Sequence, residues 1–102
     1  PVRLADSGFP IETALLQNMP NPFNPATLIP YQLGEAGRVT IKVYSTLGQE
    51  LRILVDEVHE VGRYEVIWDG RDQVGREVAS GVYLYRFQTD HFVAVRKALL
   101  LR

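Results

Sequence analysis

The chain contains no cysteine, only two histidines and no long hydrophobic run. The absence of cysteine excludes disulfide bonds, thiolate-bound zinc or iron–sulfur clusters, and a cysteine nucleophile. A membrane-spanning helix needs about 20 consecutive apolar residues, whereas the longest wholly apolar stretch here is Ala98–Leu101. No transmembrane segment is therefore expected. The compartment stays open, because chains without cysteine occur both inside and outside cells.

The charge is almost balanced, with 11 Lys and Arg against 12 Asp and Glu. Proteins that bind nucleic acids present a basic surface to the phosphates, so nucleic acid is not an expected partner. The length of 102 residues, of which 46% are hydrophobic, fits one domain with one modest core.

The N-terminal part of the chain shows no hydrophobic period. Residues 1–12 are expected to be a linker from a larger precursor, which leaves residues 13–102 as the domain. Thr13–Gln17 is a candidate for a short first strand. Asn18–Pro25 holds three prolines and three asparagines and is expected to be a stiff, extended or turning segment. Phe23, its one large apolar ring, is expected to insert into the core.

Alternation of apolar and polar residues dominates the remainder, which is typical of half-buried strands. No segment has the i, i+3, i+4 spacing of a helix over three turns. The expected strands are residues 27–33, 39–44, 50–55, 63–69, 82–89 and 92–101. Six or seven short strands separated by glycine turns predict an all-β sandwich.

The alternation also predicts which side chains face inward. The residues expected in the core are Val39, Ile41, Val43, Tyr64, Val66 and Trp68. A common face is expected for Leu51, Ile53 and Val55. Cross-strand pairing is expected between two sets, Tyr83, Tyr85 and Phe87 on one strand and Val93, Val95 and Leu99 on the next. Pro30 cannot donate a ladder hydrogen bond, which favours an edge strand or a bulge.

The histidines complete no catalytic or metal-binding motif. His59-Glu60 begins like the zinc-protease H-E-x-x-H, but Arg63 stands where the second histidine belongs. His59 is therefore interpreted as a solvated loop residue, and His91 as part of a hairpin tip. We expect no catalytic residue, no metal and no cofactor. An exposed Trp68 would instead favour a carbohydrate-binding platform.

The glycine-rich connection before the last two strands offers two further motifs. Gly70–Glu77 has the glycine spacing of a phosphate loop, but it lacks the lysine and the serine or threonine that such a loop needs. Asp69 and Asp72 could suggest calcium, yet two carboxylates fall short of the six to eight oxygens that calcium takes. The better interpretation is that both aspartates cap tight turns, with Gly70 and Gly75 supplying positive φ angles.

Four fragments together resemble one known family. They are L-L-Q-N-M-P-N-P-F-N-P-A-T (residues 15–27), V-Y-S-T-L-G-Q-E (43–50), G-R-Y-E-V-I-W-D-G-R-D-Q-V-G-R-E-V-A-S-G-V-Y-L-Y-R (62–86) and R-K-A-L-L-L-R (96–102). As a set they resemble the type A C-terminal sorting domain of type IX secretion cargo. That family overlaps with the immunoglobulin-like domain of FlgD-like flagellar hook-capping proteins.

The resemblance implies an immunoglobulin-like β-sandwich of about seven antiparallel strands with no catalytic activity. Such a domain directs a multidomain protein through the periplasm and the outer membrane to the cell surface or the medium. The implied partners are an outer-membrane secretion translocon and a cell-surface sortase, with catalytic or binding domains upstream in the same precursor. The sorting-signal candidates carried over by position are Gly81, Val82, Tyr83, Arg86, Lys97, Leu99, Leu100, Leu101 and Arg102.

Two alternatives remain open at this point. From the residues alone, Lys97 and Arg102 fit equally well a strand end that a receptor captures and charges that protect a sheet edge from aggregation. At the level of the whole domain, the alternative is a FlgD-like structural or protein-binding module, a spacer or appendage of an extracellular protein.

Overall fold

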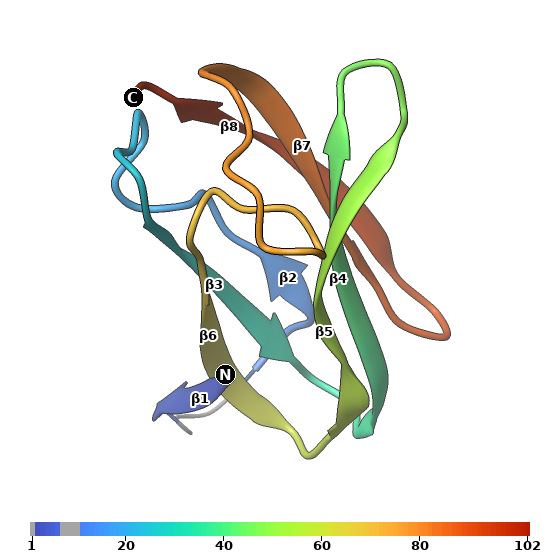
Figure 1. The fold of residues 1–102 in the computed structure, drawn as a ribbon. Helices are drawn as coiled ribbons and strands as arrows, with labels where there is room; N and C mark the ends of the chain where they lie inside the picture. The colour runs from blue at the N-terminus through green and yellow to red at the C-terminus, as the bar shows by residue number, and fades with distance from the viewer. Residues whose placement is uncertain (1, 7–10) are drawn as a thin grey trace.

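Two antiparallel sheets pack face to face in the computed structural model, which describes residues 2–6 and 11–102 (Figure 1). The strand order is β1-β6-β3-β2 in the first sheet and β5-β4-β7-β8 in the second. The strands are β1 (Arg3–Asp6), β2 (Ala14–Leu15), β3 (Thr27–Leu33), β4 (Gly37–Ser45), β5 (Glu50–His59), β6 (Gly62–Trp68), β7 (Gly81–Gln88) and β8 (Val93–Leu100). The predicted all-β sandwich is confirmed, and the seven predicted strands correspond to β2–β8. Within the described part of the chain, no helix is long and apolar enough to cross a membrane.

The core lies between the two sheets and is built from the faces that the alternation predicted. Val39, Ile41 and Val43 of β4 are fully buried. Val66 and Trp68 of β6 are buried as well, and Tyr64 is partly buried at the margin of the core. The expected insertion of Phe23 is also confirmed, because only 2% of its surface is exposed.

Strand β1 corrects the expectation that residues 1–12 are only a linker. Arg3 and Leu4 lie opposite Glu65 and Tyr64 of β6, antiparallel to that strand. Four residues are too few to show a period, and β1 forms because the outer edge of β6 offers backbone groups that need partners. Residues 7–10 lie outside the described residues, and attachment to a larger precursor stays a prediction.

Strand β5 is longer and less regular than expected. The register against β4 shifts twice, between Ile41 and Lys42 and between Val43 and Tyr44. At the first shift Val55 stays opposite Ile41 and is buried, but Ile53 moves opposite Lys42 and is 37% exposed. The prediction that Leu51, Ile53 and Val55 share one face is therefore wrong, because a β-bulge reverses the alternation.

Strand β8 faces the core with the opposite set of residues from the one predicted. Ala98 lies opposite Tyr83, and Ala94 lies opposite Phe87. Val93 and Val95 are each 52% exposed, on the outer face of the sheet. The predicted pairing of Val93, Val95 and Leu99 with the aromatic residues of β7 is wrong by one residue, which moves every side chain to the other face.

Pro30 lies inside a sheet and not at its edge, since β3 is flanked by β6 and β2. The β2–β3 ladder stops one residue before it, at Leu15 opposite Tyr31. The Leu16 N–H donates to the Pro30 carbonyl at 3.0 Å, but Pro30 has no N–H to return. The Leu16 carbonyl instead accepts a hydrogen bond from the Tyr85 hydroxyl at 2.8 Å. Because Pro30 has no N–H, the Leu16 carbonyl is free to accept from Tyr85, and this hydrogen bond links the two sheets.

Replacement of Trp68 by alanine should destabilise the fold by about 3–5 kcal/mol. The indole packs against Phe23 and Tyr83, with ring centroids 5.5 Å and 5.4 Å away, and its N–H donates to the Arg71 carbonyl. Equilibrium unfolding in urea measures the loss. Leu47→Ala, at a side chain that is 96% exposed, is the control and should change the free energy of unfolding by less than about 0.5 kcal/mol. Equal stability of Trp68→Ala and wild type would contradict the burial of this face.

Candidate functional site

The outer edge of β8 is closed along its second half by residues 17–25. The backbone of Phe23 brackets this edge, because its N–H donates to the Leu99 carbonyl at 2.9 Å and its carbonyl accepts from the Leu101 N–H at 3.0 Å. Two side chains complete the closure. The Asn21 amide oxygen accepts from the Leu99 N–H at 2.9 Å, and the Gln17 amide donates to the Lys97 carbonyl at 2.8 Å.

The roles of Gln17 and Asn21 were not foreseen from the sequence. Both belong to a stretch in which prolines remove backbone donors, so side-chain amides have to supply the hydrogen bonds. The alternation of asparagine and proline in N-P-N-P-F-N-P is the signal that could have suggested it. The segment also buries the Phe23 ring beside Trp68, so edge closure and core filling are one arrangement.

The end of the chain is held against the connection between β6 and β7. The Arg102 guanidinium donates to the carbonyls of Gly70 at 2.6 Å and Val78 at 2.7 Å, and to the Glu77 carboxylate at 3.0 Å. Its backbone N–H donates to the Ser80 hydroxyl at 2.9 Å. Only 24% of the Arg102 side chain is exposed. The Arg102 side chain is therefore engaged by the domain itself.

The close approach of Arg102 explains why residue 70 is a glycine. A Cβ atom there would lie 2.9 Å from the Pro25 carbonyl oxygen and 3.0 Å from Arg102 Nη2, and the φ angle is 73°. Both the approach and the backbone conformation therefore favour glycine. Gly75 also has a positive φ angle, of 89°, as predicted.

The aspartates of this connection cap turns, which confirms their interpretation. Asp69 Oδ1 accepts hydrogen bonds from the Arg71 N–H at 3.1 Å and from Arg52 Nη1 at 3.0 Å. Asp72 Oδ1 accepts from the N–H groups of Val74 at 3.1 Å and Arg76 at 2.9 Å. In residues 2–6 and 11–102, no group of three or more His, Asp or Glu side chains is placed to hold a metal ion.

The sorting-signal candidates fall into three classes of accessibility. Tyr83 and Leu100 are buried in the core, and the Tyr83 hydroxyl donates to the Ala79 carbonyl. Three candidates are partly buried, namely Gly81, Arg86 and Leu99. Val82, Lys97 and Leu101 are exposed. The structure thus brings the candidates together on two adjacent strands, β7 and β8, and at the end that Arg102 fastens.

The outer face of β7 and β8 carries two cations with no partner. Of the Lys and Arg side chains in residues 11–102, only Arg86 and Lys97 have neither an ion pair nor a hydrogen bond among the described residues. A shallow groove of about 330 Å³ runs beside Arg86. Its lining residues are Tyr44, Gly48, Leu84, Arg86 and Val95.

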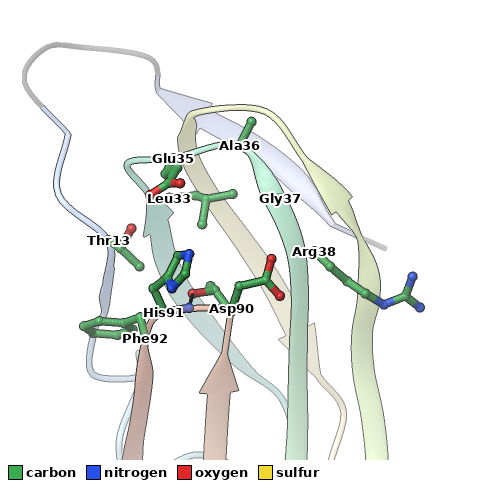
Figure 2. A pocket seen from close by; sticks show the side chains of 10 residues that line it. Thr13, Leu33, Glu35, Ala36, Gly37, Arg38, Asp90, His91 and Phe92 are labelled. Carbon is green, nitrogen blue, oxygen red and sulfur yellow. Dashed lines mark hydrogen bonds between the residues drawn. The ribbon is translucent and has the colours of Figure 1, made fainter.

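A smaller hollow lies at the opposite end of the sandwich (Figure 2). It holds about 160 Å³ between the β3–β4 turn and the β7–β8 turn, where Glu35, Asp90 and His91 face it. Arg38 points away from it toward Asp56, to which it donates at 2.6 Å. Pockets for small molecules usually enclose about 300–1,000 Å³, so this hollow is smaller than a typical ligand pocket.

His59 is buried, which corrects its interpretation as a loop residue. β5 continues to this residue, whose side chain is directed inward and forms a 2.8 Å hydrogen bond between Nε2 and the Tyr31 hydroxyl. The imidazole stacks on Tyr64 with the ring centroids 4.2 Å apart. Burial raises the pKa of the Tyr31 phenol. Tyr31 also stacks on Tyr64, so His59 and Tyr31 are part of an aromatic cluster that packs at this margin of the core.

Comparison with known proteins places the domain in a family. Residues 23–91 match the family described as the FlgD Ig-like domain. The chain belongs to this family. Its sandwich is therefore immunoglobulin-like, as predicted, and the match covers β3 to β7. Among curated proteins, no sequence match was found.

Two solved structures share the fold of this FlgD Ig-like domain. One is dimeric latent PorU from Porphyromonas gingivalis, with a TM-score of 0.70 and 18% identity over 97% of the chain. The other is PorZ from the same organism, described as an essential bacterial surface component of the type-IX secretion system. It matches with a TM-score of 0.57 and 25% identity over 84% of the chain. The chain spans only 10% of PorU and 11% of PorZ.

Removal of the Arg102 side chain should weaken the fold, whereas removal of the Lys97 side chain should not. Arg102→Ala removes the side-chain donor to the Val78 carbonyl and one of two donors to the Gly70 carbonyl, which also accepts from the Val78 N–H at 3.1 Å. This loss should cost about 1–3 kcal/mol. Lys97→Ala removes an exposed side chain and should stay within about 0.5 kcal/mol of wild type. Urea unfolding measures both, and hydrogen exchange should show faster opening at Leu101 in Arg102→Ala. Similar losses in the two variants would contradict the Arg102 contacts.

Stability should fall at alkaline pH because of buried phenols. Burial raises the pKa of Tyr31, Tyr83 and Tyr85 above the ordinary value of 10.0. Below pH 10 both the folded and the unfolded chain keep these protons, so the contribution to stability is complete. At higher pH the unfolded chain releases protons that the folded chain retains, and stability is lost. The melting temperature should therefore drop, and phenolate absorbance should rise later in the native chain than in denaturant. Coincident titrations would contradict the burial.

Proposed function

We propose that this FlgD Ig-like domain is a sorting domain, which carries a larger protein through the type IX secretion machinery to the cell surface or the medium. The observation that supports it most is the similarity to PorZ, a surface component of that system, at 25% identity over 84% of the chain. The sequence fragments that resemble type A sorting domains are residues 15–27, 43–50, 62–86 and 96–102. They include residues 17–25, all of β6 and parts of β4, β7 and β8.

Under this proposal the candidate residues divide between recognition and support. Val82, Lys97 and Leu101 are exposed and contact the outer-membrane translocon. Tyr83, Leu100 and Arg102 are buried or engaged, and they hold β7 and β8 in the shape that is recognised. The receptor therefore reads a folded surface and not a loose terminal peptide. Gly81, Arg86 and Leu99 border the exposed residues and complete this surface.

The proposal has consequences for the rest of the protein. The domain is not an enzyme, and activity resides in catalytic or binding domains upstream in the same precursor. The route runs through the periplasm and the outer membrane, and a cell-surface sortase is a further partner. The small share that the chain covers of PorU and PorZ, 10% and 11%, fits a module of a larger protein.

A second candidate is a structural or protein-binding module of an extracellular protein. The family match favours it, because the matched residues 23–91 stop before β8. The matched residues include neither Lys97 nor Leu101. Under this alternative, the end of the chain only seals the sandwich.

Export of a fluorescent protein distinguishes the two candidates. The reporter carries an ordinary periplasmic signal at its N-terminus and the 102-residue chain at its C-terminus, in a bacterium with type IX machinery. The fusion should reach the medium or the surface, and a reporter without the domain should stay in the periplasm. Deletion of Lys97–Arg102 should also keep the fusion in the periplasm. Equal export of the truncated and intact fusions would support the spacer.

The truncation needs a control for stability, since it also removes buried Leu100 and the Arg102 contacts. Leu101→Ser changes a side chain that is 50% exposed and should leave the melting temperature unchanged. Leu47→Ser is the matched exposed control on the β4–β5 turn. Reduced export of Leu101→Ser alone, at equal melting temperatures, is the expected result. If export follows the melting temperature and not the position of the change, recognition of this end is contradicted.

A further inference from the structure

The outer face of the last two strands combines exposed apolar side chains with unpaired positive charge. We call it the hairpin face. It consists of the outward residues of β7 and β8, namely Val82, Leu84, Arg86, Gln88, Val93, Val95, Lys97 and Leu99. Val82, Val93 and Val95 are 42%, 52% and 52% exposed. The face contains no carboxylate, and apolar patches bordered by charge often mark interaction sites.

The cations on the outer face of this sheet differ in whether they have an ion-pair partner. On β4, Lys42 is 3.3 Å from the Glu50 carboxylate and Arg38 is 2.6 Å from the Asp56 carboxylate. Both carboxylates come from β5. Arg86 and Lys97 lie farther away, on β7 and β8, and have no partner in the described part of the chain.

The register places the cations of neighbouring strands close to one another on the outer face. Arg86 lies directly opposite Lys42, and Lys97 lies diagonal to Arg86, because Val95 is the residue opposite Arg86. Like charges opposite each other on a sheet are destabilising. The domain has a net charge of −1, but Arg86 and Lys97 place unneutralised positive charge on the hairpin face.

We propose that the hairpin face binds a protein segment that presents carboxylates next to apolar side chains. Arg86 and Lys97 pair with the carboxylates, and the groove between Tyr44, Leu84 and Val95 receives an apolar side chain. The inference rests on the proposed function in one respect, since the partner would belong to the secretion machinery. A guanidinium matches a carboxylate with two parallel hydrogen bonds.

An anionic membrane is the less suitable partner for this face. Recognition of anionic lipid by basic residues typically uses clusters of about four to eight Lys and Arg, and the hairpin face offers two. Two cations spaced across adjacent strands, with an apolar groove of about 330 Å³ beside them, instead match the spacing of side chains on an extended polypeptide.

A binding experiment tests the surface without any export. The probe is a synthetic peptide of alternating glutamate and leucine, and its control has glutamine in place of glutamate. Added to the isotope-labelled 102-residue chain, the acidic peptide should shift amide resonances of β7, β8 and the adjacent part of β4. The binding should weaken with added salt, because exposed charges are screened.

Variants then assign the binding to the two cations. The double variant Arg86→Gln/Lys97→Gln should bind the acidic peptide about tenfold more weakly, as expected for the loss of two charge pairs. Arg38→Gln/Arg76→Gln removes the same charge from cations that already have partners and should bind like wild type. Equal weakening in both double variants, or shifts elsewhere on the domain, would overturn the proposal. So would binding to phosphatidylglycerol vesicles without binding to the peptide.

The same variants in the export assay separate the two proposals. The fusion with Arg86→Gln/Lys97→Gln should be exported less than the fusion with Arg38→Gln/Arg76→Gln, at equal melting temperatures. Equal export of the two, with the wild-type fusion exported, would overturn the hairpin face as the surface that is read and leave the sorting function intact. Failure of the wild-type fusion to leave the cell would contradict the sorting function, and the peptide experiment would still decide whether the hairpin face binds acidic segments.

Discussion

The outer edge of β8 is the constraint on which the rest of the structure depends. A sheet edge exposes N–H and C=O groups that need partners, and here Gln17, Asn21 and Phe23 supply them along the second half of the strand. The residue whose backbone bonds this edge is also the residue whose ring fills the core beside Trp68. Any change that loosens residues 17–25 therefore opens the edge and empties part of the core together.

Arg102 extends this arrangement to the last residue of the chain. Its guanidinium joins the connection between β6 and β7 at two carbonyls and one carboxylate, and Gly70 leaves the space for it. The consequence for function is that the end of β8 has a defined shape. A partner that contacts Lys97 and Leu101 meets two side chains at fixed positions, which costs less conformational entropy on binding than the ordering of a free tail.

Sequence patterns predicted the strands that are buried on one face and fully paired. In β4, β6 and β7 the large inward residues alternate strictly, so period two is sufficient. The alternation predicted the wrong inner face for β8, where apolar residues lie on both faces of the strand. Ala98 and Ala94 lie opposite the rings of Tyr83 and Phe87, and the larger valines of β8 lie on the outer face. The contacts of Arg102 with the β6–β7 connection and of Gln17 with Lys97 join residues 22 to 80 positions apart, which no local pattern encodes.

The exposed valines and the open part of the sheet edge occupy the same half of β8. Residues 17–25 cover the edge from Lys97 to Leu101, and within residues 11–102 the outward backbone groups of Val93 and Val95 have no hydrogen-bond partner. The first half of the strand thus offers unpaired backbone groups, apolar side chains and, through Arg86 on the adjacent strand, positive charge. An acidic segment bound to the hairpin face therefore lies beside backbone groups of the kind that extended peptides use for affinity in strand addition. The bulky side chains that packing excludes from the core are in this way the ones left available for a partner.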